Sequence, residues 1–234
     1  MIADQTILCE LMHPCEYCKK NFAKETTLVA HMCEPKRRYR ERDEVGVRLG
    51  LQAYLRFYEI VQRSAKPKTF DDFAASAYYR GFVKFGRYCE TTRVINFARF
   101  TEWLIKHNIK IDRWCQDSVY TEYLSQYLRD ENISDALSRS IEQSINWGEK
   151  TGNPPADFLR YGNDNVICYA ITSGRVSAWA LYNCHSGVEF FGRINPEQVS
   201  MIWPLIDSDF WSRKFQTCPA DTEYAKDILK KAGW

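Results

Sequence analysis

The chain has 234 residues, of which 45% are hydrophobic and 15% aromatic, and its 32 Lys and Arg nearly balance its 30 Asp and Glu. This length and aromatic content exclude disorder as the main state and suit one compact body, alone or with a small module. The sequence has no uninterrupted apolar run of the roughly 18–20 residues that a membrane-spanning helix needs, and its start lacks the basic and apolar regions of a signal peptide.

Nine cysteines occur in the chain, and four of them lie with two histidines near the N-terminus. The odd number and the absence of an export signal predict a reducing, intracellular location. The remaining five lie among apolar residues, where free cysteines usually behave as small buried side chains. These five are Cys89, Cys115, Cys168, Cys184 and Cys218.

The N-terminal segment has the spacing of a metal-binding finger. Cys15 and Cys18 form a C-x2-C pair, His31 follows after twelve residues, and Phe22 and Leu28 lie between them. Two thiolates in a tight turn and an imidazole on a short helix can bind one tetrahedral Zn²⁺, with the two apolar side chains as a small core. With its pattern C-x2-C-x3-F-x5-L-x2-H, the segment resembles the C2H2-type zinc finger family. The resemblance implies a ββα fold and a zinc cofactor.

The fourth ligand departs from the family pattern. In the family, three to five residues separate the first histidine from a second His or Cys, and at those positions this chain reads PKR. Cys33 is the nearest thiol, but on a continuous helix it would point about 200° away from His31. Because Pro35 disfavours helical conformation in the preceding residue, we expect the last turn to unwind and Cys33 to complete the site. Cys9 and His13 are alternative ligands, and reduced cysteines without metal are the alternative to a finger.

The finger offers little for reading a DNA sequence. In the resembling family, the residue before the helix and three positions within it face the major groove. The matching residues here are Lys24, Thr26, Thr27 and Ala30, and only Lys24 is a strong partner for a base or phosphate. One finger covers about three base pairs. We therefore expect it to help grip a phosphate backbone, or alternatively to act as a docking surface for a protein.

A basic segment, residues 36–43, follows the finger and is predicted to link it to a helical domain. Guanidinium groups match phosphate oxygens and a tyrosine can stack on a base, so we predict that the segment is a phosphate-tracking arm. The alternative is a solvated linker whose arginines pair with Glu41, Asp43 and Glu44. The predicted nucleic-acid contacts are Lys36, Arg37, Arg38, Tyr39, Arg40 and Arg42.

The net charge of the whole chain is close to zero, but the charges are unevenly distributed along the sequence. Residues 63–113 contain 11 basic and 5 acidic residues, whereas residues 114–234 contain 11 and 16. In the basic part, Arg80, Lys84 and Arg87 are spaced i, i+4, i+7, which places them on one helix face. We predict that this face extends the basic surface of the arm; a merely solvated face is the alternative. The acidic C-terminal half is expected to serve protein partners or solubility.

Helical signals dominate after residue 44. Apolar periodicity predicts helices over about 45–63, 77–89 and 92–107. The stretch 165–183 fits two helices broken at Gly174 or two strands, and we favour helices because no second strand-like region exists to pair with. Helix-start signals occur at Thr69, Asp117 or Ser118, Ser134, Asn195 and Asp207, and helix-stop signals at Gly152 and Pro204.

The predicted fold is mainly α, with an N-terminal ββα zinc finger (residues 1–35) joined by the basic linker to an all-helical globular domain (residues 44–234). The whole sequence is also loosely similar to uncharacterised proteins of tailed bacteriophages that join one such finger to a helical body. That similarity implies no activity.

No motif of an enzyme is present: the sequence lacks G-x-S-x-G, G-x4-G-K-[ST] and G-x-G-x-x-G. We therefore expect a non-enzymatic protein that binds nucleic acid, DNA rather than RNA, with low sequence specificity. One alternative is a protein–protein adaptor whose finger is a docking surface. Another is a metal-dependent nuclease accessory built from distant carboxylates.

Overall fold

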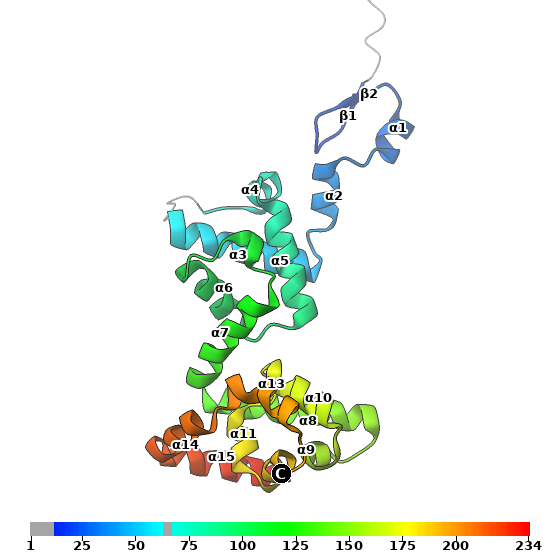
Figure 1. The fold of residues 1–234 in the computed structure, drawn as a ribbon. Coiled ribbons are helices and arrows are strands. Elements are labelled where there is room, and N and C mark those ends of the chain that lie inside the picture. Colours follow the sequence, from blue (N-terminus) through cyan, green and yellow to red (C-terminus); the bar gives the residue numbers. More distant parts are fainter. Residues whose placement is uncertain (1–11, 63–66) are drawn as a thin grey trace, which may run out of the picture. The chain divides into compact units, whose positions relative to one another are not determined.

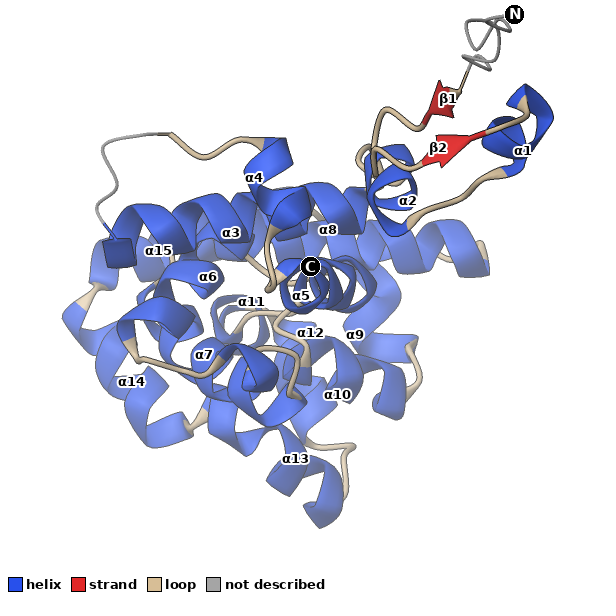
Figure 2. Cartoon of the chain, turned by 90° about the horizontal axis from the view of Figure 1, so that it is seen from above, coloured by secondary structure: helices blue, strands red, loops and turns tan. Residues whose placement is uncertain are grey.

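The computed structural model describes residues 12–62 and 67–234 (Figure 1), so the alternative ligand Cys9 lies outside the described residues. Contacts divide the chain into two compact units, Met1–Gln116 and Asp117–Trp234. The predicted boundaries at residues 35 and 43 stay predictions, and the division after Gln116 was not predicted from the sequence. Apart from one hairpin, the regular elements in the described ranges are helices (Figure 2), so the mainly α fold is confirmed.

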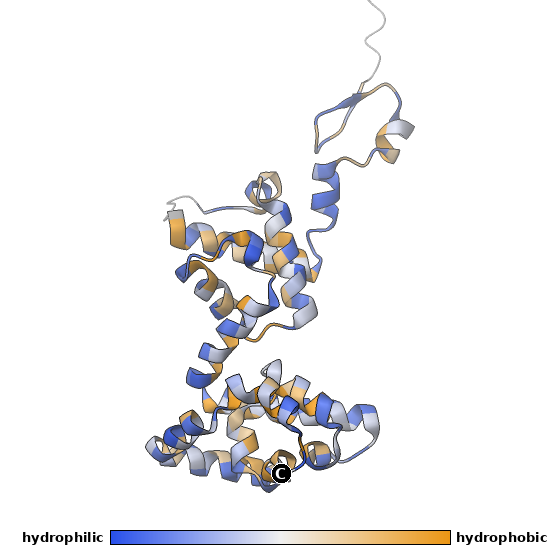
Figure 3. Ribbon diagram, viewed as in Figure 1, coloured by the Kyte–Doolittle hydropathy of each residue, from blue (hydrophilic) through white to orange (hydrophobic). Residues whose placement is uncertain are grey.

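The first unit begins with the predicted ββα arrangement. The two strands pair antiparallel, with His13 opposite Phe22. The segment predicted as a basic linker lies largely within a helix that is almost entirely hydrophilic (Figure 3). The elements are β1 (His13–Pro14), β2 (Asn21–Phe22), α1 (Glu25–Ala30) and α2 (Glu34–Arg40).

The rest of the first unit is helical, as the periodicity predicts. Thr69 caps its helix: its hydroxyl accepts from the Asp72 N–H, while the Asp72 carboxylate accepts from the Thr69 N–H. Arg93, in the left-handed region with φ 50°, ends the helix predicted over about 77–89, which runs to Thr92, and the next helix starts at Phe97 and not at about 92. The elements are α3 (Val45–Gln62), α4 (Phe70–Ala75), α5 (Tyr79–Thr92), α6 (Phe97–Lys106) and the 3-10 turn η1 (Ile111–Arg113).

α3 and α5 pack with their backbones in close approach. A Cβ on Gly86 would lie 1.9 Å from the carbonyl oxygen of Gly46 and 2.5 Å from the nitrogen of Gly50, so no side chain fits there. The aromatic rings of Phe82 and Trp114 meet edge to face beside this crossing, with centroids 5.7 Å apart. The crossing fixes α5 in place and leaves its basic face exposed.

The second unit is made of helices around a core that includes Trp179, Phe190 and Trp211, each at most 1% exposed. Two expected features are present: Gly152, at φ 75°, ends α8, and Gly174, at φ 72°, separates the two helices of the 165–183 stretch. The elements are α7 (Asp117–Asp130), α8 (Ile133–Thr151), η2 (Pro155–Asp157), α9 (Phe158–Tyr161), α10 (Asp164–Thr172), α11 (Ala178–Asn183), α12 (His185–Phe191), α13 (Pro196–Ile206), α14 (Ser208–Thr217) and α15 (Pro219–Lys231).

Two predicted helix boundaries in the second unit are wrong. The N-cap of α8 is Asn132, whose side-chain oxygen accepts from the N–H of Ser134 at 2.8 Å. The predicted stop at Pro204 fails because α13 continues to Ile206. A proline in the last turn removes one helical hydrogen bond, and here the helix ends two residues later anyway.

In the part of the chain that the structure describes, no helix combines the length and the apolar character needed to cross a bilayer.

Candidate metal centre and adjoining groove

The four side chains predicted as zinc ligands lie together. One potential ligand atom from each of Cys15, Cys18, His31 and Cys33 lies within 4.8 Å of all the others. The two sulfurs of Cys15 and Cys33 are 3.9 Å apart, and Cys18 Sγ is 3.2 Å from His31 Nε2. With Zn–S near 2.3 Å and Zn–N near 2.0–2.1 Å, a tetrahedral site has ligand separations of about 3.5–3.8 Å. The cluster can therefore hold a metal ion such as zinc. His13 is not part of it.

The hairpin positions the first two thiols. The N–H of Cys15 donates to the Lys20 carbonyl and the N–H of Lys19 donates to the Cys15 carbonyl, both at 2.8 Å. Lys19 has φ 59°, which allows this tight knuckle. A hydrogen bond from the backbone N–H of Cys18 lowers the pKa of Cys15 to about 7, although burial acts in the opposite direction. Since the thiolate is the form that binds zinc, the knuckle prepares Cys15 as a ligand.

The last two ligands come from an extended segment and not from one helix. α1 ends at Ala30, and both His31 (φ −68°, ψ 122°) and Cys33 (φ −84°, ψ 162°) have extended backbones. In an extended chain the side chains of residues i and i+2 point to the same side, so both reach the cluster. The unwinding is present as expected, but its predicted cause is wrong, because Pro35 lies in the first turn of the next helix, α2.

The predicted core of the finger surrounds this cluster. The ring of Phe22 lies 4.6 Å from the imidazole of His31, centroid to centroid, and both Phe22 and Leu28 are half-buried. The finger also contacts the helix that follows. Lys36 Nζ donates to the His31 carbonyl at 3.1 Å, and the rings of Tyr17 and Tyr39 are 5.2 Å apart. Cys33 is itself the N-cap residue of α2, so a ligand of the cluster adjoins the basic arm directly.

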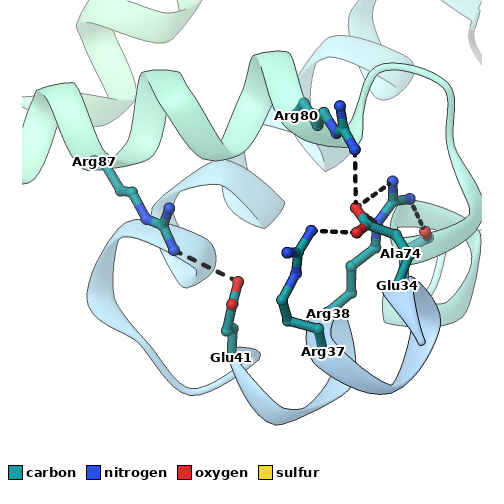
Figure 4. A network of polar contacts seen from close by, with 7 residues as sticks. All are labelled: Glu34, Arg37, Arg38, Glu41, Ala74, Arg80 and Arg87. Atoms are coloured by element: carbon teal, nitrogen blue, oxygen red, sulfur yellow. Dashed lines mark hydrogen bonds and ion pairs between the residues drawn. The ribbon is translucent and has the colours of Figure 1, made fainter. Parts of the chain in front are cut away.

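The basic arm and the basic face of α5 meet in one open groove with a volume of about 450 Å³, which we call the α2/α5 groove. Figure 4 shows arginines from both helices facing carboxylates of α2 and the residue after it. Five cationic side chains and two carboxylates line it. The lining residues are Glu34, Arg37, Arg38, Glu41, Tyr79, Arg80, Val83, Lys84 and Arg87.

Glu34 is the centre of the polar contacts in this groove. Its carboxylate pairs with Arg37, accepts from Arg38 Nη2 at 3.1 Å, and lies 3.5 Å from Arg80 Nη2 (Figure 4). Partial burial raises the pKa of Glu34, but Arg38, Arg37 and Arg80 outweigh it and hold that pKa below its usual range. The carboxylate is therefore ionised at neutral pH.

The structure agrees only in part with the alternative interpretation, a solvated linker whose own arginines pair with its carboxylates. Within the described residues, Arg42 pairs with Asp43 at 3.4 Å, but Glu41 and Glu44 pair instead with Arg87 of α5, at 3.5 and 2.8 Å. The carboxylates of this segment thus connect the arm to α5.

The remaining predicted nucleic-acid contacts lie around the groove or on the finger. Arg40 lies 3.9 Å from the sulfur of Met32, and Arg42 stacks on the ring of Tyr39 at 4.3 Å. Lys24, immediately before α1, and Thr27 within it are both exposed on the finger. In the part of the chain described, neither Lys24 nor Lys84 has an ion-pair partner.

Glu34 and Tyr79 line the groove but were not predicted as functional residues. The spacing of Glu34 to Arg37 and Arg38, i to i+3 and i+4, is a signal for pairing on a helix, but the segment was not expected to be helical. No local signal marks Tyr79, because its place depends on how α5 packs.

Comparisons of the chain with protein-family models, with curated proteins and with solved structures give no match. What the residues themselves establish is a Cys3His cluster beside a short hairpin that can hold a metal ion. Among the described residues it is the one group of three or more His, Cys, Asp and Glu side chains close enough to do so. Asp207, predicted from the sequence to start a helix, accepts from the N–H groups of Asp209 and Phe210 as the N-cap of α14.

Proposed function

We propose that this protein binds the phosphate backbone of nucleic acid, DNA in the first instance, without catalysing a reaction. The contact surface is the α2/α5 groove together with the zinc-organised finger. The observation that carries the proposal is the convergence of Arg37 and Arg38 with Arg80, Lys84 and Arg87, residues from two separate helices, on one groove.

The chemistry of the groove supports phosphate as the ligand. Its five cations outnumber its two carboxylates, and four of the five are arginines. Guanidinium forks match pairs of phosphate oxygens, whereas the groove has few groups that could distinguish one base from another. Binding of this kind is largely independent of sequence and falls as salt rises, because bound phosphates release their counterions.

Zinc would act here as a structural ion. Bound by Cys15, Cys18, His31 and Cys33, it would supply the folding free energy that a core of two half-buried apolar side chains cannot. The bound ion would thereby hold Lys24 and the start of α2 in one ordered segment.

Salt-titrated binding of short labelled DNA and RNA duplexes tests the proposal. The variant Arg80→Gln/Lys84→Gln/Arg87→Gln is expected to weaken binding and to reduce the slope of log K against log salt by about 2–3. The matched control, Arg99→Gln/Lys106→Gln/Lys110→Gln, removes as many exposed charges outside the groove. Affinity that does not respond to salt, or equal losses in both variants, would contradict phosphate binding by the groove.

A protein-docking role is the second candidate, and exposed apolar side chains on the finger favour it. Val29 of α1 is 72% exposed and Met32 is 48% exposed. The adaptor hypothesis predicts a protein partner that stays bound after nuclease treatment and after charge reversal of Arg37, Arg38 and Arg40. It also predicts that Val29→Asp releases that partner while binding to DNA is unchanged.

A further inference from the structure

The carboxylate of Glu34 lies where a phosphate would be expected in the α2/α5 groove. It contacts the guanidinium groups of Arg37, Arg38 and Arg80, which come from two helices. Carboxylate and phosphate bind arginine through the same charge-assisted hydrogen bonds, so a site that fits one anion also suits the other.

Arg38 keeps its position without help from Glu34. Its Nη1 donates to the carbonyl oxygen of Ala74 at 2.6 Å, and its guanidinium lies 4.4 Å from the centroid of the Tyr79 ring. The side chain is only 17% exposed. The remaining donors, Nε and Nη2, are directed at one oxygen of Glu34, at 3.2 and 3.1 Å. If Glu34 turns away, these two donors are left preorganised for another anion.

Tyr79 gives an independent indication that the groove suits a polar ligand. The residue lines the groove and is 4% exposed, yet its buried hydroxyl has no hydrogen-bond partner in the residues that the structure describes. A buried hydroxyl without a partner is unfavourable, so an incoming oxygen atom or a bridging water would stabilise it.

We propose that Glu34 is an internal competitor of phosphate, and that a phosphate group binds in the α2/α5 groove by displacing its carboxylate from Arg38 and Arg80. Glu34 can move, because its side chain is 34% exposed and lines a groove that is open to solvent. The inference rests on the proposed function as far as the source of the phosphate is concerned. It adds that, in the free protein, the carboxylate of Glu34 lowers the affinity of the groove for phosphate.

The test measures the affinity of the intact, zinc-loaded protein for a short labelled DNA duplex, by fluorescence anisotropy at fixed salt. Glu34→Gln is expected to bind about tenfold more tightly than the wild type, because the competing charge is gone while the shape is kept. Asp43→Asn is the matched control: it removes an equal charge nearby, which within the described residues forms an ion pair with Arg42 alone. The gain in DNA affinity of this control is expected to stay below about threefold, because an exposed ion pair contributes little free energy.

A double-mutant cycle locates the effect at Arg38. In the Arg38→Gln background, Glu34→Gln is expected to give no gain, because the preorganised donors are absent. Glu34→Asp, which keeps an acidic residue in the first turn of α2, is expected to give an intermediate gain. Zinc content and circular dichroism establish that each variant is folded, and Glu34→Asp replaces Glu34→Gln if the latter is not.

Inorganic phosphate is the second probe, followed through the Nε–H NMR signal of Arg38. Binding of free phosphate that tightens in Glu34→Gln, without binding of DNA, would support the inference and reject the proposed function. Equal gains in Glu34→Gln and Asp43→Asn, or a gain that persists without Arg38, would overturn the inference and leave the proposed function standing. No binding of either probe by any variant would reject both.

Discussion

The sulfur of Cys33 lies 3.9 Å from the sulfur of Cys15, eighteen residues earlier in the chain. Cys33 is at the same time the N-cap residue of α2, the helix that carries the basic arm. A metal held by this cluster would therefore fix the start of α2 as well as the finger. The groove begins at the next residue, Glu34, so the candidate metal centre and the candidate anion site are neighbours along the backbone.

Loss of the fourth ligand is expected to weaken metal binding strongly. Substitutions that only disturb the surroundings of a metal ligand cost about 10–100-fold in affinity, so Cys33→Ser, which removes a thiolate, should cost more than 100-fold in zinc affinity. Competition with a chromophoric chelator measures this. Cys218→Ser, far from the cluster in sequence, is the control and should bind zinc like the wild type. A loss in Cys9→Ser or His13→Ala with Cys33→Ser unaffected would mean that the fourth ligand is another residue.

Removal of zinc is expected to unfold the finger and to spare the second unit. The core of the finger consists of Phe22 and Leu28, both only half-buried, which is too little to order the segment alone. Hydrogen exchange should show that the amides of Cys15 and Lys19, protected by their 2.8 Å bonds, lose protection after chelation, while those of α8 do not change. Protection that survives in metal-free protein would show that zinc does not organise this segment.

Close packing of α3 against α5 predicts a specific intolerance at Gly86. A Cβ there would collide with backbone atoms of Gly46 and Gly50, so Gly86→Ala is expected to destabilise the protein by about 1–3 kcal/mol. Gly81→Ala in the same helix is the control, because its Cβ would meet the nearest atom, of Ile111, at 3.4 Å. It should be neutral or stabilising by up to about 1 kcal/mol. Urea denaturation of both variants measures the difference, and equal stabilities would contradict the close crossing.

The second unit contains a buried carboxyl that predicts a pH dependence of stability. Burial raises the pKa of Glu131 to about 7, although Arg139, at 2.8 Å, and Lys214 favour its charged form, while Asp135 opposes it. Because the folded pKa lies above the unfolded value of 4.5, the unfolded state ionises first as pH rises. The contribution of Glu131 to the stability of the folded state is fully present below pH 4.5 and is lost as pH rises through about 7.

Glu131→Gln should remove this pH dependence. As pH rises from the unfolded to the folded pKa, the free energy of unfolding of the wild type is expected to fall by on the order of 3 kcal/mol relative to that of the variant. Denaturant unfolding at a series of pH values measures this difference. The comparison subtracts the effects of all other titrating groups, which the two proteins share. A constant difference across this range would show that Glu131 is already ionised in the folded protein.

Features that depend on near neighbours in the chain were predictable. The cap at Thr69 and the left-handed glycine at Gly152 each involve a few consecutive residues, whose geometry follows from backbone sterics and short-range hydrogen bonds. The ligands from Cys15 to His31 lie within one short segment, and their spacing is that of a known type of zinc site. For the same reason Cys33 could be named as a ligand, although the extended backbone that brings it there could not be inferred from Pro35.

Features that depend on distant contacts emerged only from the tertiary structure. The groove brings Glu34 to within 3.5 Å of Arg80, 46 residues away, and the ion pairs with Arg80 and Arg87 require α5 to pack in the place that its close contact with α3 at Gly86 allows. Charge spacing can place cations on one face of a helix, but it carries no information on which helix that face will meet. The packing of the core makes that choice, and it places the segment predicted as a linker along one wall of the α2/α5 groove.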